Sequence, residues 1–267
     1  MKALKPISLN SKYGPWAIVT GASSGIGREV AILLGSSGFN LVLVARRKDK
    51  LEALSEELKK ASTIDTVVLP LDLAKEDSLQ QLARATSALE VGLLVAAAGF
   101  GTSGPFLEGE ATREKQMLRL NCESVLDQCL HFGEKFASRG GGGIVLFGSI
   151  LGFQGTPFSA HYAATKAYNQ SLAEGLHVEM KSSGVDVIAS APGPTETEFA
   201  SSADMTMSGA MSPHGVARET LRALGRRSTA IPGFQTKFLS YSLAMLPRWM
   251  RVRIMGAVMS GMTNHHG

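Results

Sequence analysis

Residues 16–27 read WAIVTGASSGIG, an apolar run typical of a strand that passes directly into a glycine-rich turn. Beyond the turn, the apolar residues recur at helical spacing. Glycines in a strand–turn–helix unit let backbone N–H groups approach a pyrophosphate, and the amino end of the helix adds a positive dipole. The stretch therefore predicts a dinucleotide site at the first βα turn. The residues expected to contact the dinucleotide there are Thr20, Gly21, Ser23, Ser24, Gly25, Ile26 and Gly27.

Short apolar runs alternate with longer amphipathic stretches up to about Ile231, which is the pattern of βαβ units. Residues 41–44 are apolar at every position, which indicates a strand buried on both faces of a parallel sheet. Right-handed crossovers then predict a single-domain, Rossmann-like, doubly wound α/β fold of about seven strands. The strands are expected at residues 16–20, 40–45, 66–71, 92–97, 143–149, 185–191 and 229–231.

Charge and hydropathy narrow the class of protein. The 267 residues carry 27 Lys and Arg against 23 Asp and Glu, a formal net charge of +4, and the basic residues are scattered along the chain. Nucleic acid is therefore not an expected partner. No stretch approaches the ~18 uninterrupted apolar residues that would span a bilayer. The N-terminus also lacks the apolar core of a secretory signal.

The two cysteines predict a reducing compartment. Cys122 and Cys129 fall on one predicted helix, about 10 Å apart along its axis. That separation is too large for a disulfide, so both are expected to be small buried hydrophobic residues. Neither has a His at ligand spacing beside it, and no metal site is expected. We expect a cytoplasmic protein.

Three polar residues around the fifth predicted strand suggest redox chemistry. Tyr162 and Lys166 share one face of a helix at i and i+4. Ser149 closes the preceding strand, at the carboxyl edge where open α/β sheets bind ligands. Carbonyl reduction needs a proton donor at the oxygen while hydride arrives at the carbon, and the reverse reaction needs a base there. A free phenol has a pKa near ~10. An ammonium at about 4 Å lowers that pKa substantially only in a site closed to bulk water.

Taken together, the Gly-x-x-x-Gly-x-Gly spacing of residues 21–27, Ser149, Tyr162 and Lys166 closely resemble the short-chain dehydrogenase/reductase family, over roughly residues 14–233. The resemblance implies an oxidoreductase that interconverts a ketone or aldehyde with an alcohol on an apolar small molecule. It makes Tyr162 the general acid and base, and Lys166 the residue that lowers its pKa and holds the nicotinamide ribose. Ser149 would bond the substrate oxygen. The alternative is an NADP(H)-binding sensor on the same fold, which could dispense with Tyr162 and Lys166.

Asn121 matches the fourth member of the family's catalytic set, which positions a water leading from Lys166. Its other interpretation is a polar residue within a helix, bonded to backbone. His161, beside Tyr162, is expected to point to a different helix face.

The end of the second predicted strand favours NADP(H) over NAD(H). An NAD-selective fold places an acid there to bind the ribose hydroxyls, whereas this chain has Ala45, Arg46 and Arg47. Two guanidiniums can bind a 2′-phosphate through forked, charge-assisted hydrogen bonds. The other interpretation is a solvated helix start, although cations at a helix N-terminus oppose the macrodipole.

Further cofactor contacts follow from the resemblance. Asp72 would accept from the adenine amino group, with a helix N-cap as its alternative. The fourth strand usually ends Asn-Asn-Ala-Gly in the family but reads AAAG at residues 96–99 here, which changes the support of the strand end. The loop 192–197 resembles the family's loop over the nicotinamide, with Thr197 bonding the carboxamide. The remaining expected contacts are Leu73, Ala98, Gly99, Pro192, Gly193 and Thr195.

Two groups of residues are expected around the substrate pocket. Residues 199–212, rich in Ser, Ala and Met, are expected to form a mobile lid. Four phenylalanines are expected to line an apolar pocket or to belong to the core: Phe100, Phe106, Phe153 and Phe158.

The C-terminal residues 234–267 form a basic, Met-rich segment broken by Pro247, which we expect to be a helical extension of the domain formed by residues 1–233. A cover for the pocket, a subunit contact and a membrane-surface anchor are its three possible roles, of which the first two are preferred. We expect a homodimer or homotetramer, because the helices near residues 113–138 and 161–182 resemble those that the family uses to dimerise.

Overall fold

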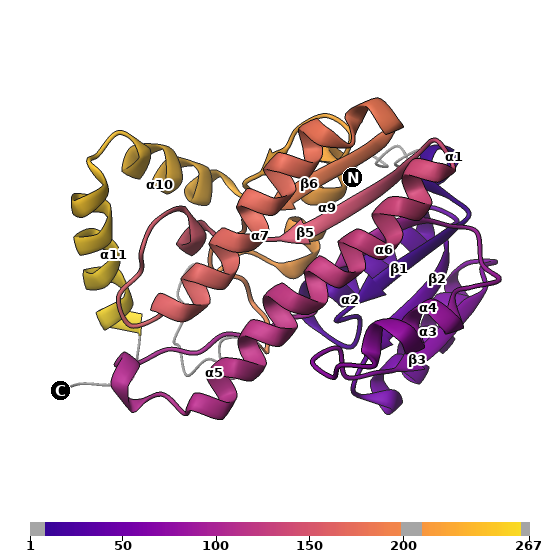
Figure 1. The fold of residues 1–267 in the computed structure, drawn as a ribbon, viewed down its shortest axis with the longest axis horizontal. Helices are drawn as coiled ribbons and strands as arrows, with labels where there is room; N and C mark the ends of the chain where they lie inside the picture. Colours follow the sequence, from indigo (N-terminus) through magenta and orange to yellow (C-terminus); the bar gives the residue numbers. More distant parts are fainter. Residues whose placement is uncertain (1–8, 199–209, 263–267) are drawn as a thin grey trace.

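A computed structural model describes residues 9–198 and 210–262. Within them, one parallel sheet has the strand order β3-β2-β1-β4-β5-β6-β7, which confirms the doubly wound α/β fold (Figure 1). The chain order reverses between β1 and β4, which lie side by side, and this is where such sheets bind ligands. The strands are β1 (Trp16–Thr20), β2 (Asn40–Ala45), β3 (Thr66–Pro70), β4 (Val91–Ala96), β5 (Gly142–Phe147), β6 (Val185–Ser190) and β7 (Thr229–Ala230).

Helices cover both faces of the sheet. The first layer is α2 (Gly25–Ser36), α3 (Lys48–Ala61) and α9 (Pro213–Ala223), and the second is α4 (Ser78–Ala85), α6 (Ser124–Ser138) and α7 (Ala160–Glu179). The shorter elements are α1 (Asn10–Tyr13), η1 (Phe106–Glu108), α5 (Ala111–Leu118), the π-helical turn η2 (Arg119–Glu123), η3 (Ile150–Phe153) and η4 (Lys181–Ser183). Two further helices, α10 (Phe234–Ala244) and α11 (Arg248–Met262), stand apart from the sheet at one end of the molecule (Figure 1).

The continuous apolar strands are explained by two cores. Along β1, Ala17 and Val19 are fully buried against the layer of α2, whereas Ile18 is fully buried against the layer of α6. Successive side chains of a strand point to opposite faces. A strand between two helix layers must therefore be apolar at every position, as residues 41–44 are.

Several strands end before their predicted last residue, which moves functional side chains onto loops. β5 ends at Phe147 and not at Ser149, and β3 ends at Pro70. Ser149 instead begins η3, where its Oγ accepts the N–H of Leu151 at 3.2 Å. Its side chain is thereby fixed just beyond the carboxyl edge of the sheet.

Both cysteines are buried and unpaired, as predicted. Burial raises the pKa of Cys122 to about 11, so its thiol stays protonated near neutral pH.

Candidate active site

A cavity of about 700 Å³ lies at the carboxyl edge of the sheet. It extends from the glycine turn after β1 to the α10–α11 end of the molecule. Thr20 and Asn121 are fully buried outside its lining. All other predicted site residues line it: Gly21, Ser23, Ser24, Gly25, Ile26, Gly27, Arg46, Arg47, Asp72, Leu73, Ala98, Gly99, Ser149, Tyr162, Lys166, Pro192, Gly193, Thr195 and Thr197.

Close backbone approaches dictate the glycines of the first turn. Gly21 has φ +66°, and a Cβ there would lie 2.9 Å from the backbone of Ala97. A Cβ on Gly27 would lie 2.4 Å from the carbonyl oxygen of Gly21. Any larger residue would therefore force α2 away from β1 and β4, and the wall on which a pyrophosphate would rest would be lost.

Thr20 supports the end of β4, where the family has amide side chains. Its Oγ1 accepts the N–H of Ala98 at 3.1 Å. The Thr20 hydroxyl on β1 therefore holds the end of β4, where Ala96 and Ala97 have no amide side chains to do so.

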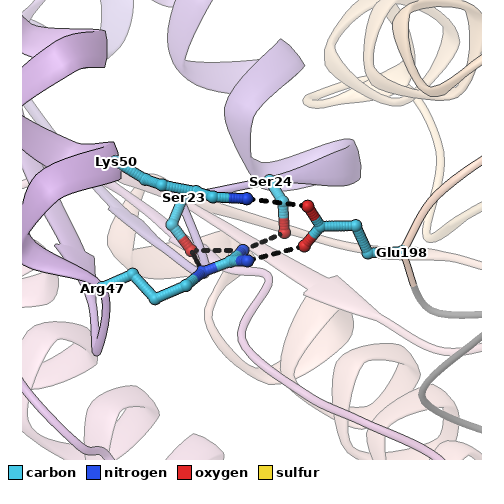
Figure 2. Close-up of polar contacts among 5 residues, drawn as sticks. All are labelled: Ser23, Ser24, Arg47, Lys50 and Glu198. Atoms are coloured by element: carbon cyan, nitrogen blue, oxygen red, sulfur yellow. Dashed lines mark hydrogen bonds and ion pairs between the residues drawn. The ribbon is translucent and has the colours of Figure 1, made fainter.

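Arg47 is held in a polar cluster at the mouth of the cavity (Figure 2). Its Nη2 donates to Ser23 Oγ at 3.1 Å and to Ser24 Oγ at 2.8 Å. Its Nη1 donates to Glu198 Oε2 at 2.7 Å, and Lys50 Nζ donates to Glu198 Oε1 at 2.8 Å. Arg47 is thus directed at the glycine turn, unlike a cation at a solvated helix start.

Glu198 shows that this cluster attracts an anion. Hydrogen bonds from Lys50 and Arg47 lower the pKa of its carboxyl group to about 2. No sequence pattern pointed to this residue, because the fold brings it from the loop after β6 to the start of α3, about 150 positions away in the chain. A carboxylate bound between two cations stands in for the anionic group that a ligand would bring.

Asp72 does not cap a helix. Its Oδ1 accepts the N–H of Ala74 at 3.1 Å, while α4 begins only at Ser78. The N-cap interpretation is wrong for this residue, which instead holds the turn after β3 at the cavity wall.

Tyr162, Lys166 and Ser149 come together in the cavity wall, each only 7% exposed. Lys166 Nζ donates to the carbonyl oxygen of Phe147 at 3.0 Å and lies 5.6 Å from the centroid of the Tyr162 ring. Burial raises the pKa of Tyr162, and a hydrogen bond with Ser149 partly opposes that rise. Burial lowers the pKa of Lys166 to about 8, opposed by Cys122. Burial therefore outweighs the expected lowering of the Tyr162 pKa, and the phenol holds its proton at neutral pH.

Asn121 links the loop after β4 to α7. Its Nδ2 donates to the carbonyl oxygen of Phe100 at 2.9 Å and to Thr165 Oγ1 at 3.0 Å, and its Oδ1 accepts the N–H of Phe100 at 3.2 Å. It lies in the π-helical turn η2, a feature frequent at functional sites. The backbone bonds are as predicted by the second interpretation, but they join a distant loop and not the helix of Asn121 itself.

His161 faces away from the cavity, as predicted. Its Nδ1 lies 2.6 Å from Glu114 Oε2 on α5. His161 therefore helps hold α5 against α7.

Side chains of α10 and α11 line the apolar end of the cavity, where the tail was expected to cover the pocket, and its role as a cover stays a prediction. Of the four phenylalanines, only Phe100 lines this cavity; Phe106 and Phe158 line a separate hollow of about 40 Å³. The predicted pocket of phenylalanines is wrong because the loop of Phe106 turns outward, leaving that ring 68% exposed. The C-terminal lining residues are Leu239, Met255, Val258, Met259 and Met262.

Most of the predicted lid, residues 199–209, lies outside the described residues, including Met205 and Met207. Its end is fixed to the loop 192–197. Met211 N–H donates to the carbonyl oxygen of Pro194 at 2.9 Å, and Glu196 N–H donates to that of Met211 at 3.0 Å. The two ends of the segment are thereby held at the cavity.

Comparison with known proteins places these features in a family. A family model described as short chain dehydrogenase matches residues 15–207. A 7beta-hydroxysteroid dehydrogenase of Clostridium sardiniense is 32% identical over 231 residues, 85% of this chain and 88% of its own length. A very-long-chain 3-oxoacyl-CoA reductase of Podospora anserina is 39% identical over 181 residues, 66% of this chain but 53% of its own length.

Solved structures of dehydrogenases have a similar fold. A structure described for 7beta-hydroxysteroid dehydrogenase stereoselectivity has a TM-score of 0.86 at 25% identity, covering 92% of this chain and 98% of that one. A short-chain dehydrogenase from Sphingobium yanoikuyae in complex with NADPH has a TM-score of 0.80 at 30% identity, covering 87% and 94%.

Proposed function

The chain belongs to the short chain dehydrogenase family, whose members here act on hydroxyl and carbonyl groups, and on that premise we propose an NADP(H)-dependent oxidoreductase for bulky apolar ketones and the matching alcohols. One observation carries the proposal. Tyr162, Lys166 and Ser149 meet in the wall of a single cavity, between the glycine turn and an apolar end.

The polar half of the cavity fits a dinucleotide. The glycine turn leads into the amino end of α2, where backbone N–H groups and the helix dipole favour a pyrophosphate. Arg46 and Arg47 line the same half, and Arg47 already binds a carboxylate. NADP(H), when bound, supplies or accepts the hydride. Thr197 and the loop 192–197 would hold its nicotinamide end.

Tyr162 is assigned as the proton donor in reduction. Its raised pKa keeps the proton on the phenol until the carbonyl oxygen develops negative charge. Ser149 would bond the same oxygen, because its side chain stands in the wall beside Tyr162. Lys166 is assigned to hold the nicotinamide ribose, and Asn121 to fix the loop of Phe100 against α7.

The side chains at the apolar end of the cavity indicate the class of substrate. Methionine side chains are flexible and fill irregular shapes, so the lining from α11 suits a large apolar body. The relatives named for a hydroxysteroid and a very-long-chain oxoacyl substrate support this class. A screen of oxo-steroids, 3-oxoacyl thioesters and small polar aldehydes, read as NADPH oxidation, tests it. Turnover of the polar aldehydes alone, or NADPH binding with no turnover at all, would overturn the proposal.

Carbonyl reduction should weaken as pH rises through about 8. Lys166, with its pKa lowered to about 8, is charged below that pH and neutral above it. A neutral amine can still donate, but the bond to the ribose loses its charge assistance, so kcat/KM for NADPH, which reports the free enzyme, should fall above that pH by at most about 10-fold per pH unit. A pH profile of kcat/KM measures it.

Lys166→Arg tests whether Lys166 causes this fall of kcat/KM, because a guanidinium stays charged over the same pH range. In this variant, the fall of kcat/KM above pH 8 should disappear, whatever the absolute rate of the variant. A fall with an unchanged midpoint would assign it to another group.

Removing the charge of Glu198 should strengthen NADPH binding. Glu198 neutralises Arg47 and Lys50, so a 2′-phosphate must displace it or bind beside it. Glu198→Gln should lower the Kd for NADPH about 5-fold, or ~1 kcal/mol, and leave that for NADH nearly unchanged. Fluorescence titration of both cofactors measures this; Glu179→Gln, at the exposed end of α7, is the control. Equal changes for NADPH and NADH would contradict the assignment.

The assembly is a further proposal. α6 and α7 carry exposed apolar side chains, with Leu130 65% and Val178 73% exposed. These helices correspond to those expected to dimerise, and a homodimer or homotetramer would cover them. The domain boundary near residue 233 and the cytoplasmic location stay predictions.

A further inference from the structure

α10 carries a stripe of large apolar side chains on its outer face. Phe234, Phe238, Tyr241 and Met245 are 83%, 68%, 64% and 88% exposed. Their spacing of four, three and four residues places them on one face of the helix. We call these four residues the apolar stripe.

The fold does not account for the stripe. α10 packs inward through its opposite face, where Ser240 and Leu243 are buried and Leu239 lines the cavity. Within residues 9–198 and 210–262, the outer face is therefore apolar and leaves its large side chains uncovered. Trp249, 60% exposed at the start of α11, adds a further apolar side chain. Figure 1 shows both helices projecting from the sheet, where neither helix layer covers them. Exposed apolar groups gathered in this way mark interaction sites.

Charge identifies the partner. Residues 234–267 contain Lys237, Arg248, Arg251 and Arg253 but no Asp or Glu, so they account for the whole net charge of +4. Lys237 is paired with Glu219, and Arg251 bonds the carbonyl oxygens of Leu246 and Ala244. Arg248 and Arg253 are exposed, and the Arg253 guanidinium lies 5.3 Å from the centroid of the Trp249 ring.

We propose that α10 and the start of α11 bind the surface of a bilayer that contains anionic lipid, with the apolar stripe and Trp249 at the level of the headgroups. Aromatic side chains favour that level, and Arg248 and Arg253 would bind the anionic headgroups. None of the described helices is long and apolar enough to cross a bilayer, so the contact is peripheral.

A second copy of the chain fits this surface less well. In a two-fold contact the same patch meets itself. Arg248 and Arg253 would then face a patch whose charged side chains are all cations, because residues 234–267 contain no acid to pair with them. An anionic surface satisfies both the cations and the apolar stripe.

Flotation of the full chain with lipid vesicles tests the proposal. Wild-type protein should float with vesicles of phosphatidylcholine and phosphatidylserine, much less with phosphatidylcholine alone, and less at high salt. Phe234→Ser with Phe238→Ser should lower the bound fraction at least ~10-fold, since both rings leave the interface. Arg248→Glu should lower it at least ~5-fold.

The controls carry the same chemical change outside α10 and α11. Leu107→Ser removes an exposed apolar side chain from η1, and Arg222→Glu reverses an exposed charge on α9. Both should float as wild type, and thermal unfolding checks that every variant is folded.

Three results would overturn the proposal: no flotation of the wild type, flotation indifferent to phosphatidylserine, or equal losses in the control variants. If the stripe variant instead lowers the mass of the assembly in sedimentation, and the wild type does not float, the surface belongs to a second copy. Vesicle binding needs neither cofactor nor ketone, so its failure leaves the proposed reaction untouched.

Discussion

Tyr162→Phe is expected to lose at least ~100-fold in kcat, as the loss of a general acid does, while NADPH still binds. Burial keeps the proton on the phenol, and the substitution removes that transferable proton but keeps the ring. Ser149 retains its bond from the N–H of Leu151, so the wall should not rearrange. Steady-state reduction and a fluorescence titration of NADPH separate the two effects.

The matched control is Tyr168→Phe on the same helix, where the ring is 36% exposed. It should retain wild-type turnover. If Tyr162→Phe keeps more than a few per cent of wild-type activity, the barrier has risen by less than ~2 kcal/mol, short of the ~2.7 kcal/mol that a 100-fold loss requires, and another group donates the proton. His161 is a poor substitute, because it is bonded to Glu114 away from the cavity.

Local patterns were enough to predict the sheet. β1 and β2 have the predicted bounds, because an apolar run that starts after Pro15 or Gly38 and ends at a polar turn leaves little freedom. The shared position of Tyr162 and Lys166 on α7 could also be predicted, since residues at i and i+4 lie on one face once a helix forms. The ends of the strands could not be predicted as well, because Gly148 and Ser149 also fit an extended backbone, whereas the pairing of β5 with β6 stops at Phe147.

Contacts between distant segments escaped prediction. Glu198 reaches Arg47 only because the loop after β6 lies over the amino end of α3. Met255 and Met259 line the cavity because α11 folds back on it, and a Met-rich sequence says nothing of which side it packs against. Burial was not weighed for Tyr162 in the sequence, and it raises the pKa of that phenol, against the lowering expected from a neighbouring ammonium.

The second large effect concerns cofactor choice. Wild type should prefer NADPH, because Arg46 and Arg47 line the cavity where a 2′-phosphate would lie. Ala45→Asp with Arg46→Gln and Arg47→Gln supplies an acceptor for a 2′-hydroxyl and removes both guanidiniums. Two charge-assisted bonds at about 1.5–3 kcal/mol each predict a fall of at least ~100-fold in the NADPH-to-NADH ratio of kcat/KM.

The geometry of Arg47 sets how that result is interpreted. Arg47 also holds Ser23, Ser24 and Glu198, so its loss leaves the Glu198 carboxylate with one cation fewer beside it, and the carboxylate then repels phosphate more strongly and deepens the expected fall. The two arginines would share one anion, so their contributions need not add. Lys59→Gln with Lys60→Glu, at the far end of α3, lowers the net charge by the same amount as the triple variant and should leave the ratio unchanged. A wild type that favours NADH, or a triple variant whose ratio moves less than ~5-fold, about 1 kcal/mol, would contradict the assignment of Arg46 and Arg47 to the 2′-phosphate.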